Sequence, residues 1–335
     1  MPSLPKPRFR SGRTRGSVAA RPSEPERPDV EIVEAPGGVS GPLRWINVER
    51  PREADRAWLE EHFEFHPLDY EDVFSRNQRP KVDEYDDYLF VVLHFPAFDK
   101  TVGRLNAAEV DFFVGPDYLI TLPNESMPPL EYLFERCRSS EEFREQLFAK
   151  GPAFLLYKIV DDCVDASFPM LRKMGNKLER LEEDIFEGRS AEIVRDLSNV
   201  KQEIINFRKV VRPQRAALKD LERTKRYVPE DLEIYFDDIN DASERIWDML
   251  ENYKEVVEGL ESTNESVLSH RLNDALRFLT AFSVVVLPLT LIASVFGMNV
   301  RVPGEGSITA FWIVVVAMIV VLVGMLAVFR RRGFL

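Results

Sequence analysis

Two long uncharged apolar stretches lie close together near the end of the chain, at residues 278–296 and 308–329. Each has about the 20 residues that an α-helix needs to cross the hydrocarbon core of a bilayer. Only residues 297–307 separate them, which leaves room for a tight loop and little else. The sequence therefore predicts a hairpin of two membrane spans whose outer ends lie on the same side of the membrane.

Three arginines, Arg330 to Arg332, follow the second stretch. Basic residues beside a span mark its cytoplasmic side, so we expect both termini in the cytoplasm and the protein in the plasma membrane. Two spans cannot enclose a path for a solute. A transporter of this design must therefore be an oligomer with its pore on the symmetry axis, whereas the alternative is a hairpin that serves only as an anchor.

The rest of the chain is strongly acidic. Residues 1–30 carry a net charge of +4 and residues 297–335 one of +3, which leaves −19 for the middle of a chain whose total is −12. Nucleic-acid binding normally needs a basic face, so this charge argues against it and favours the attraction of cations. Cys137 and Cys163 are the only cysteines, which fits a reducing compartment. We find no phosphate-binding loop or nucleophile elbow, and the sequence predicts no enzyme.

Hydrophobic periodicity divides the soluble part into an α/β region and a helical region. Runs of β-branched and aromatic residues at 88–98 and 109–122 predict strands, the second run forming a hairpin at Gly115-Pro116. From Leu232 to Asn299 only Pro288 interrupts a helical pattern, which predicts one helix of roughly 100 Å. The predicted segments are a disordered basic tail (1–30), an α/β subdomain (31–128), a helical hairpin (129–231), the cytoplasmic part of the long helix (232–277), a first span (278–299), an outer loop (300–307), a second span (308–329) and a basic cytoplasmic tail (330–335).

The tripeptide Gly297-Met298-Asn299 ends the first span, and one more span with a basic tail follows it. This arrangement resembles the CorA family of magnesium and cobalt ion transporters. Residues 66–95 and 273–299 are similar to the family's cytoplasmic signature and to its pore helix. The resemblance covers residues 43–335. It implies an α+β cytoplasmic domain built as an α/β/α sandwich, a very long pore-lining helix and a funnel-shaped homopentamer that conducts Mg²⁺ passively and often passes Co²⁺ and Ni²⁺.

An amide at the end of a span suits a filter for Mg²⁺. The ion gives up its water reluctantly, so a filter can hold it through that water. The side-chain carbonyl of Asn299 accepts hydrogen bonds from such water, whereas a carboxylate would hold the ion more tightly and release it more slowly. The alternative is that Asn299 only caps the helix C-terminus. The resemblance favours a selectivity filter made of Gly297, Met298 and Asn299.

The resemblance places four further pore-facing positions on the long helix, at Asn273, Leu279, Leu287 and Ser294. At about 100° per residue they fall within roughly a 120° arc of the helix. Leu279 and Leu287 would form apolar constrictions that close the pore by dewetting, and Asn273 a polar ring at its cytoplasmic end. The alternative is that the leucines face lipid or the second span, because a uniformly apolar run has no informative periodicity.

Two departures from the family pattern concern the metal. Ser294 stands where many members have glycine, and the outer loop lacks the Met-Pro-Glu-Leu that often follows the motif. In that loop Arg301 opposes Glu305, its single acidic residue. Because the loop is thought to concentrate cations, these departures bear on ion attraction and on the choice of metal.

A regulatory Mg²⁺ site between neighbouring cytoplasmic domains is also implied by the resemblance, at Asp99 and Asp238. Carboxylates from two subunits repel each other until a divalent ion neutralises them, so losing the ion would bias the channel open. Asp237 and Asp241 are auxiliary candidates, since Asp241 follows Asp238 by three residues and shares its helix face. The alternative is that residues 237–241 are a solvated acidic surface.

Two other functions compete with a Mg²⁺ channel. One is a Zn²⁺ transporter of the related branch, whose members depart from Gly-Met-Asn. The other is a non-conducting, membrane-anchored scaffold, which predicts no conduction and tolerance of Asn299→Ala. The expected partners are further copies of the chain, the lipid bilayer and divalent cations, with Mg²⁺ as both the transported and the regulatory ion.

Overall fold

The computed structural model describes residues 27–35, 42–75, 78–99, 104–187, 190–298 and 307–331. The chain divides into two compact units. The first comprises the chain up to Ala166 together with Val210–Glu244, and the second comprises Ser167–Lys209 and the chain from Arg245 onward. Most of the predicted N-terminal tail, most of the predicted outer loop and the last four residues lie outside the described part.

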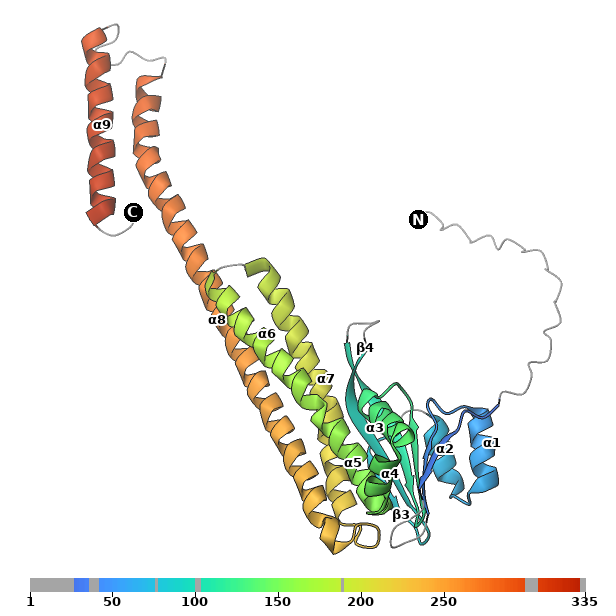
Figure 1. Cartoon of the computed structure of the whole chain (residues 1–335). Coiled ribbons are helices and arrows are strands. Elements are labelled where there is room, and N and C mark those ends of the chain that lie inside the picture. The colour runs from blue at the N-terminus through green and yellow to red at the C-terminus, as the bar shows by residue number, and fades with distance from the viewer. Residues whose placement is uncertain are drawn as a thin grey trace, which may run out of the picture. The chain divides into compact units, whose positions relative to one another are not determined.

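A mixed sheet forms the centre of the first unit (Figure 1). Its strand order is β1-β2-β6-β5-β4-β3, and β2 and β6 run parallel. The strands β5 and β6 form the predicted hairpin, in which a Cβ on Gly115 would lie 2.2 Å from the ring of Tyr118. Only glycine fits that turn without displacing the ring. The strands are β1 (Glu31–Ala35), β2 (Leu43–Asn47), β3 (Lys81–Glu84), β4 (Leu89–Asp99), β5 (Arg104–Val114) and β6 (Tyr118–Pro123).

Helices cover both faces of the sheet. On one face, α1 (Glu53–His62) and α2 (Pro67–Ser75) enclose an aromatic core in which the rings of Phe65 and Phe113 stack at 4.0 Å. On the other face, Phe134 of α3 (Pro128–Ser139) meets Trp45 of β2 edge to face, with ring centroids 4.9 Å apart. The short α4 (Glu141–Phe148) and α5 (Pro152–Asp165) complete this second layer. The predicted α/β/α arrangement is therefore confirmed.

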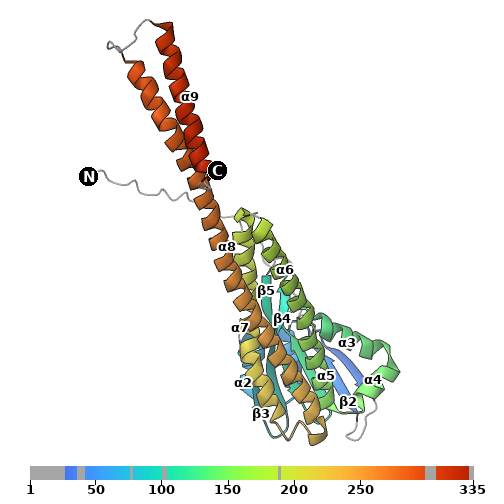
Figure 2. The same cartoon turned by 90° about the vertical axis from the view of Figure 1, so that its left-hand side faces the viewer.

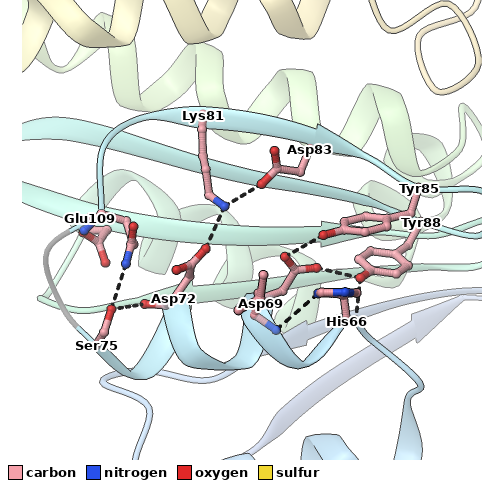
Figure 3. A network of polar contacts seen from close by, with 11 residues as sticks. His66, Asp69, Asp72, Ser75, Lys81, Asp83, Tyr85, Tyr88 and Glu109 are labelled. Atoms are coloured by element: carbon pink, nitrogen blue, oxygen red, sulfur yellow. Dashed lines mark hydrogen bonds and ion pairs between the residues drawn. The ribbon is translucent and has the colours of Figure 1, made fainter.

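The signature stretch at residues 66–95 is held together around a buried carboxylate (Figure 3). Asp69 of α2 is 1% exposed and accepts hydrogen bonds from the hydroxyls of Tyr85, at 3.0 Å, and Tyr88, at 2.6 Å. The hydroxyl of Tyr88 in turn accepts a bond from the N–H of His66 at 2.7 Å. Lys81 of β3 adds an ion pair to Asp72 of α2 at 2.7 Å. These contacts fasten α2 to the β3–β4 edge of the sheet.

A second buried carboxyl belongs to Asp111 of β5. It is 2% exposed, and its Oδ1 has no hydrogen-bond partner in the described part of the chain. Burial raises its pKa well above the ordinary value, and the charge of Glu109 raises it further. Asp111 therefore keeps its proton in the folded chain at pH values where the unfolded chain has lost it.

We expect Asp111→Asn to remove a pH dependence of stability. Between the ordinary pKa of 3.8 and the raised pKa of Asp111 in the fold, the wild-type fold binds up to one more proton than the unfolded chain, so its free energy of unfolding falls as pH rises, by up to about 1.4 kcal/mol per pH unit. Asparagine is neutral throughout, so the variant should gain stability relative to wild type as pH rises. Thermal unfolding of the full-length protein in detergent tests this, with the exposed Glu135→Gln as control. A difference from wild type that does not change with pH would contradict it.

Helices dominate the second unit, and the break that precedes them was not predicted. Apolar residues keep a helical spacing through residues 153–187, but α5 ends at Asp165 and α6 (Ser167–Glu187) begins two residues later. Pro169 has no N–H to donate to the carbonyl of Asp165, so a continuous helix would lose that bond. The sequence analysis assigned residues 129–231 to a single helical hairpin. Within the described residues, this segment begins with α3, α4 and α5, and only α6 and α7 (Ser190–Glu222) form the hairpin.

The predicted long helix is α8, which runs unbroken from Glu233 to Phe296 and contains Pro288. In the second unit its buried residues Leu250, Val257, Leu260 and Asn264 recur at spacings of seven, three and four. This is the seam of a coiled coil. Ion pairs such as Lys201–Glu261, at 2.7 Å, join α7 to α8 along it.

Candidate ion-conduction and regulatory sites

Two helices, α8 and α9 (Ile308–Arg331), are long and apolar enough to cross a membrane. No residue of α9 is buried. The apolar core helix of a water-soluble protein would be buried, so exposed apolar helices of this length point to lipid or to other membrane helices as their surroundings. The two predicted spans therefore coincide with the C-terminal part of α8 and with α9.

One face of α8 is covered inside this hairpin. Ala281 and Val285 are 4% and 9% exposed, and Pro288 and Ile292 continue the same face as partly buried residues. The helix α9 runs alongside this part of α8 (Figure 2). Its own partly buried residues recur at spacings of about one helical turn, for example Val314, Met318, Val321, Leu322 and Met325. The two stripes mark the contact between the spans.

The four predicted pore positions lie on the other side of α8. Leu279 and Leu287 are 59% and 65% exposed, and Asn273 and Ser294 are exposed as well. At about 100° per residue, the middle of this row is roughly 150° from the middle of the stripe that faces α9. The leucines therefore do not pack on the second span of their own chain, which leaves lipid or other copies of the chain as their neighbours.

The motif begins where α8 ends. The N–H of Gly297 donates to the carbonyl of Ala293 at 2.9 Å, and a Cβ added to Gly297 would lie 3.1 Å from that oxygen. Met298 follows with its side chain 58% exposed. Asn299, the amide of the predicted filter, lies outside the described residues.

An open acidic pocket of about 490 Å³ lies in the first unit, at the N-terminal end of α8. The structure thereby brings together the three aspartates predicted on α8 for regulation. The fourth predicted residue, Asp99, ends β4, and its side chain lies outside the described part. The pocket is lined by Tyr157 of α5 and by Ile234, Tyr235, Asp237, Asp238 and Asp241 of α8.

The neighbouring helix α5 adds acidic residues that the sequence analysis did not identify. Burial raises the pKa of Asp165, and the charge of Asp161 and, more weakly, that of Asp238 raise it further. The charges of acidic residues on α5 and on α8 therefore both act on Asp165. The spacing of Asp161 and Asp165, four residues apart on a helix, was the available signal.

Carboxylate oxygens are the ligands that Mg²⁺ prefers. Among the described residues, however, no group of three or more His, Cys, Asp and Glu side chains is arranged to hold a metal ion. The pocket of one chain thus offers oxygen ligands of the right kind without a complete coordination shell.

The model of one protein family, described as CorA-like Mg²⁺ transporter protein, matches residues 40–331. Among curated proteins, the chain is 29% identical to a cobalt/magnesium transport protein CorA of Thermotoga maritima, over 92% of this chain and 87% of that protein. It is also 29% identical to a putative metal ion transporter of Bacillus subtilis, over 87% and 89%.

A solved structure has the same fold over nearly its whole length. The complete structure of a CorA magnesium transporter from Methanocaldococcus jannaschii matches with a TM-score of 0.77 at 20% identity, covering 91% of this chain and 98% of that one.

Proposed function

Because the chain belongs to the CorA family, we propose that it forms a homopentameric channel in the plasma membrane for passive Mg²⁺ influx, which also passes Co²⁺ and Ni²⁺. Divalent-cation transport follows from the family, and the choice of Mg²⁺ is our inference. The observation that carries it is the intact Gly297-Met298-Asn299 at the end of the first span, with one span to follow. Neither an anchor nor a scaffold needs that tripeptide.

The exposed row of α8 lines the pore in this proposal. The face of α8 that carries Ala281 and Val285 packs against α9 of the same chain. The opposite face of α8 is therefore free to meet the same face of other copies. On a symmetry axis, Leu279 and Leu287 then form two apolar constrictions, with Asn273 below them and Ser294 above. Asn299 forms the outer ring, where its amide oxygens accept hydrogen bonds from the water that Mg²⁺ keeps.

Influx into liposomes that contain the purified, verified oligomer tests the function, with Mg²⁺ and Zn²⁺ assayed side by side. Mg²⁺ influx down its gradient is the expected result. If Zn²⁺ enters and Mg²⁺ does not, the fold assignment stands, but the transported ion is that of the related zinc branch. If neither ion enters, the hairpin serves only as a membrane anchor.

Regulation is assigned to Asp99 and Asp238, with Asp237 and Asp241 as auxiliary ligands. The three aspartates on α8 share one open pocket but do not complete a metal site within one chain. Ligands from a neighbouring copy would complete the site, and its occupancy would then report the internal Mg²⁺ concentration to the assembly.

Asp238→Asn should weaken closure by internal Mg²⁺. The variant loses one carboxylate ligand from each copy, so influx should persist at internal Mg²⁺ concentrations roughly tenfold higher than those that close the wild type, a shift of about 1.4 kcal/mol per site. Liposomes loaded with graded Mg²⁺ measure the shift. Asp248→Asn is the matched control, because Asp248 is also exposed on α8 and does not line the pocket. An equal effect of both variants would point to net charge and not to this site.

A further inference from the structure

The connection between α7 and α8, residues 223–232, is short and folded on itself. The N–H of Tyr227 donates to the carbonyl of Thr224 at 2.9 Å, which closes a turn soon after the end of α7. Lys225 forms an ion pair with Glu233, the first residue of α8. Because so few residues separate the two helices, a contact that holds this connection also holds the start of α8.

The turn between β3 and β4, residues 85–88, holds the connection. The hydroxyl of Tyr227 donates to the backbone carbonyl of Tyr85 at 2.6 Å, in a partly buried hydrogen bond. The guanidinium of Arg226 donates to Oδ1 of Asp86 at 2.9 Å. The two side chains of this ion pair are 54% and 93% exposed, and a pair so open to water contributes little. We call the two contacts together the α8 clamp, and the hydrogen bond of Tyr227 is its main part.

The turn that Tyr227 contacts is itself firmly held (Figure 3). The N–H of Tyr85 donates to the carbonyl of Tyr88 at 3.0 Å, and the rings of these two residues stack with their centroids 4.5 Å apart. Both hydroxyls donate to the buried Asp69 of α2. Tyr85 is thus fixed through its N–H, its ring and its hydroxyl, so its carbonyl is a stationary acceptor for Tyr227.

The acidic pocket begins immediately after the clamped connection. Its three aspartates, with Ile234 and Tyr235, come from about the first three turns of α8. Tyr157 of α5 completes the lining, and its ring centroid lies 4.9 Å from that of Tyr235. Because the three aspartates share one short helical segment, a shift or rotation of that segment would move all of them at once.

We propose that the α8 clamp sets the Mg²⁺ affinity of the acidic pocket, with Tyr227 as the positioning residue. The inference rests on the proposed regulatory role of Asp238. A site whose ligands are already in place binds its ion more tightly than a site whose ligands must first be ordered. When the clamp is open, the apparent affinity falls with the fraction of chains in which α8 starts in the correct position. The clamp then fixes the internal Mg²⁺ concentration at which the channel closes.

The test is a Mg²⁺ titration of the full-length protein in detergent by calorimetry. The relevant signal is the part of the binding that Asp238→Asn abolishes. Tyr227→Phe removes only the hydroxyl of the clamp and changes no charge, so it should bind Mg²⁺ roughly 2- to 10-fold more weakly in this part, the factor that corresponds to one lost hydrogen bond. Tyr132→Phe is the matched control, because Tyr132 of α3 is 67% exposed and takes no part in the clamp.

Two further measurements separate positioning from a loss of stability. In liposomes, closure of Tyr227→Phe should need roughly 2- to 10-fold more internal Mg²⁺, whereas influx at low internal Mg²⁺ should equal that of wild type. In the absence of Mg²⁺, hydrogen exchange should become faster at the amides of residues 233–241 and stay unchanged in α6. A protein that is merely destabilised would lose influx and would exchange faster throughout.

An unchanged Mg²⁺ affinity of Tyr227→Phe, beside a wild type that binds through Asp238, overturns the proposal. Equal weakening in Tyr132→Phe overturns it as well, because the effect would then not belong to the clamp. If wild type shows no Mg²⁺ binding that depends on Asp238, the regulatory site itself fails and the regulatory role of the clamp falls with it. Faster exchange at residues 233–241 in Tyr227→Phe would in that case identify the clamp as a purely structural contact.

Discussion

Asn299→Ala is expected to reduce Mg²⁺ influx by at least about tenfold. Each copy loses one acceptor for the hydration water of the ion, and a hydrogen bond of this kind is worth about 0.5–1.5 kcal/mol. A ring that loses all its acceptors at once exceeds the roughly 1.4 kcal/mol that corresponds to a factor of ten. The initial rate of Mg²⁺ uptake into liposomes with equal amounts of verified oligomer measures the effect.

Two companion variants make this result specific to the amide. Asn299→Asp keeps an acceptor but adds charge, so the ring should bind the ion more tightly and slow its passage. Thr309→Ala removes an exposed polar group from the first turn of α9 and should leave the rate close to wild type. A normal rate in Asn299→Ala would show that the residue only caps the helix, and the filter would have to lie elsewhere.

Leu287→Asn is expected to keep the channel open when internal Mg²⁺ is high. The proposed closed state depends on apolar side chains that exclude water from a narrow pore, and an amide at that level lets water remain. Because Leu287 is 65% exposed on the face opposite to α9, the substitution should leave the hairpin intact. Uptake should then continue under internal Mg²⁺ that reduces wild-type uptake about tenfold or more, a closure worth at least about 1.4 kcal/mol.

A conservative exchange controls for size at the same position. Leu287→Met preserves volume and apolar character, so the variant should close as the wild type does. Retained closure in Leu287→Asn would place this residue against lipid and not in the pore. The constriction would then have to be sought at Leu279.

Much of the architecture followed from patterns along the chain. Uncharged stretches of membrane length predicted two long apolar helices near the end of the sequence, which appear as the end of α8 and as α9. A helical pattern without breakers predicted the continuous helix that the structure places at Glu233–Phe296. Alternating apolar runs around Gly115 predicted the β5–β6 hairpin. Each of these features depends on local composition and spacing, which a sequence states directly.

Other features depend on which surfaces meet. The division between α5 and α6 was not predicted, because apolar residues keep a helical spacing across Ala166 and only Pro169 marks the break. The sequence analysis also did not identify Asp161 and Asp165, because nothing in residues 153–166 indicates that α5 lies beside the start of α8. The aspartates 237, 238 and 241 were predicted, but their common pocket with Tyr157 arises only from the packing of α5 and α8.

The membrane part shows the same division most clearly. Composition was sufficient to identify two spans and the Gly-Met-Asn that ends the first, because the bilayer selects for length and for the absence of charge. It was not sufficient to orient α8, because every face of an all-apolar helix looks alike in sequence. The folded hairpin breaks that symmetry by burying Ala281 and Val285, and so leaves Leu279 and Leu287 on the face that is free to meet other copies.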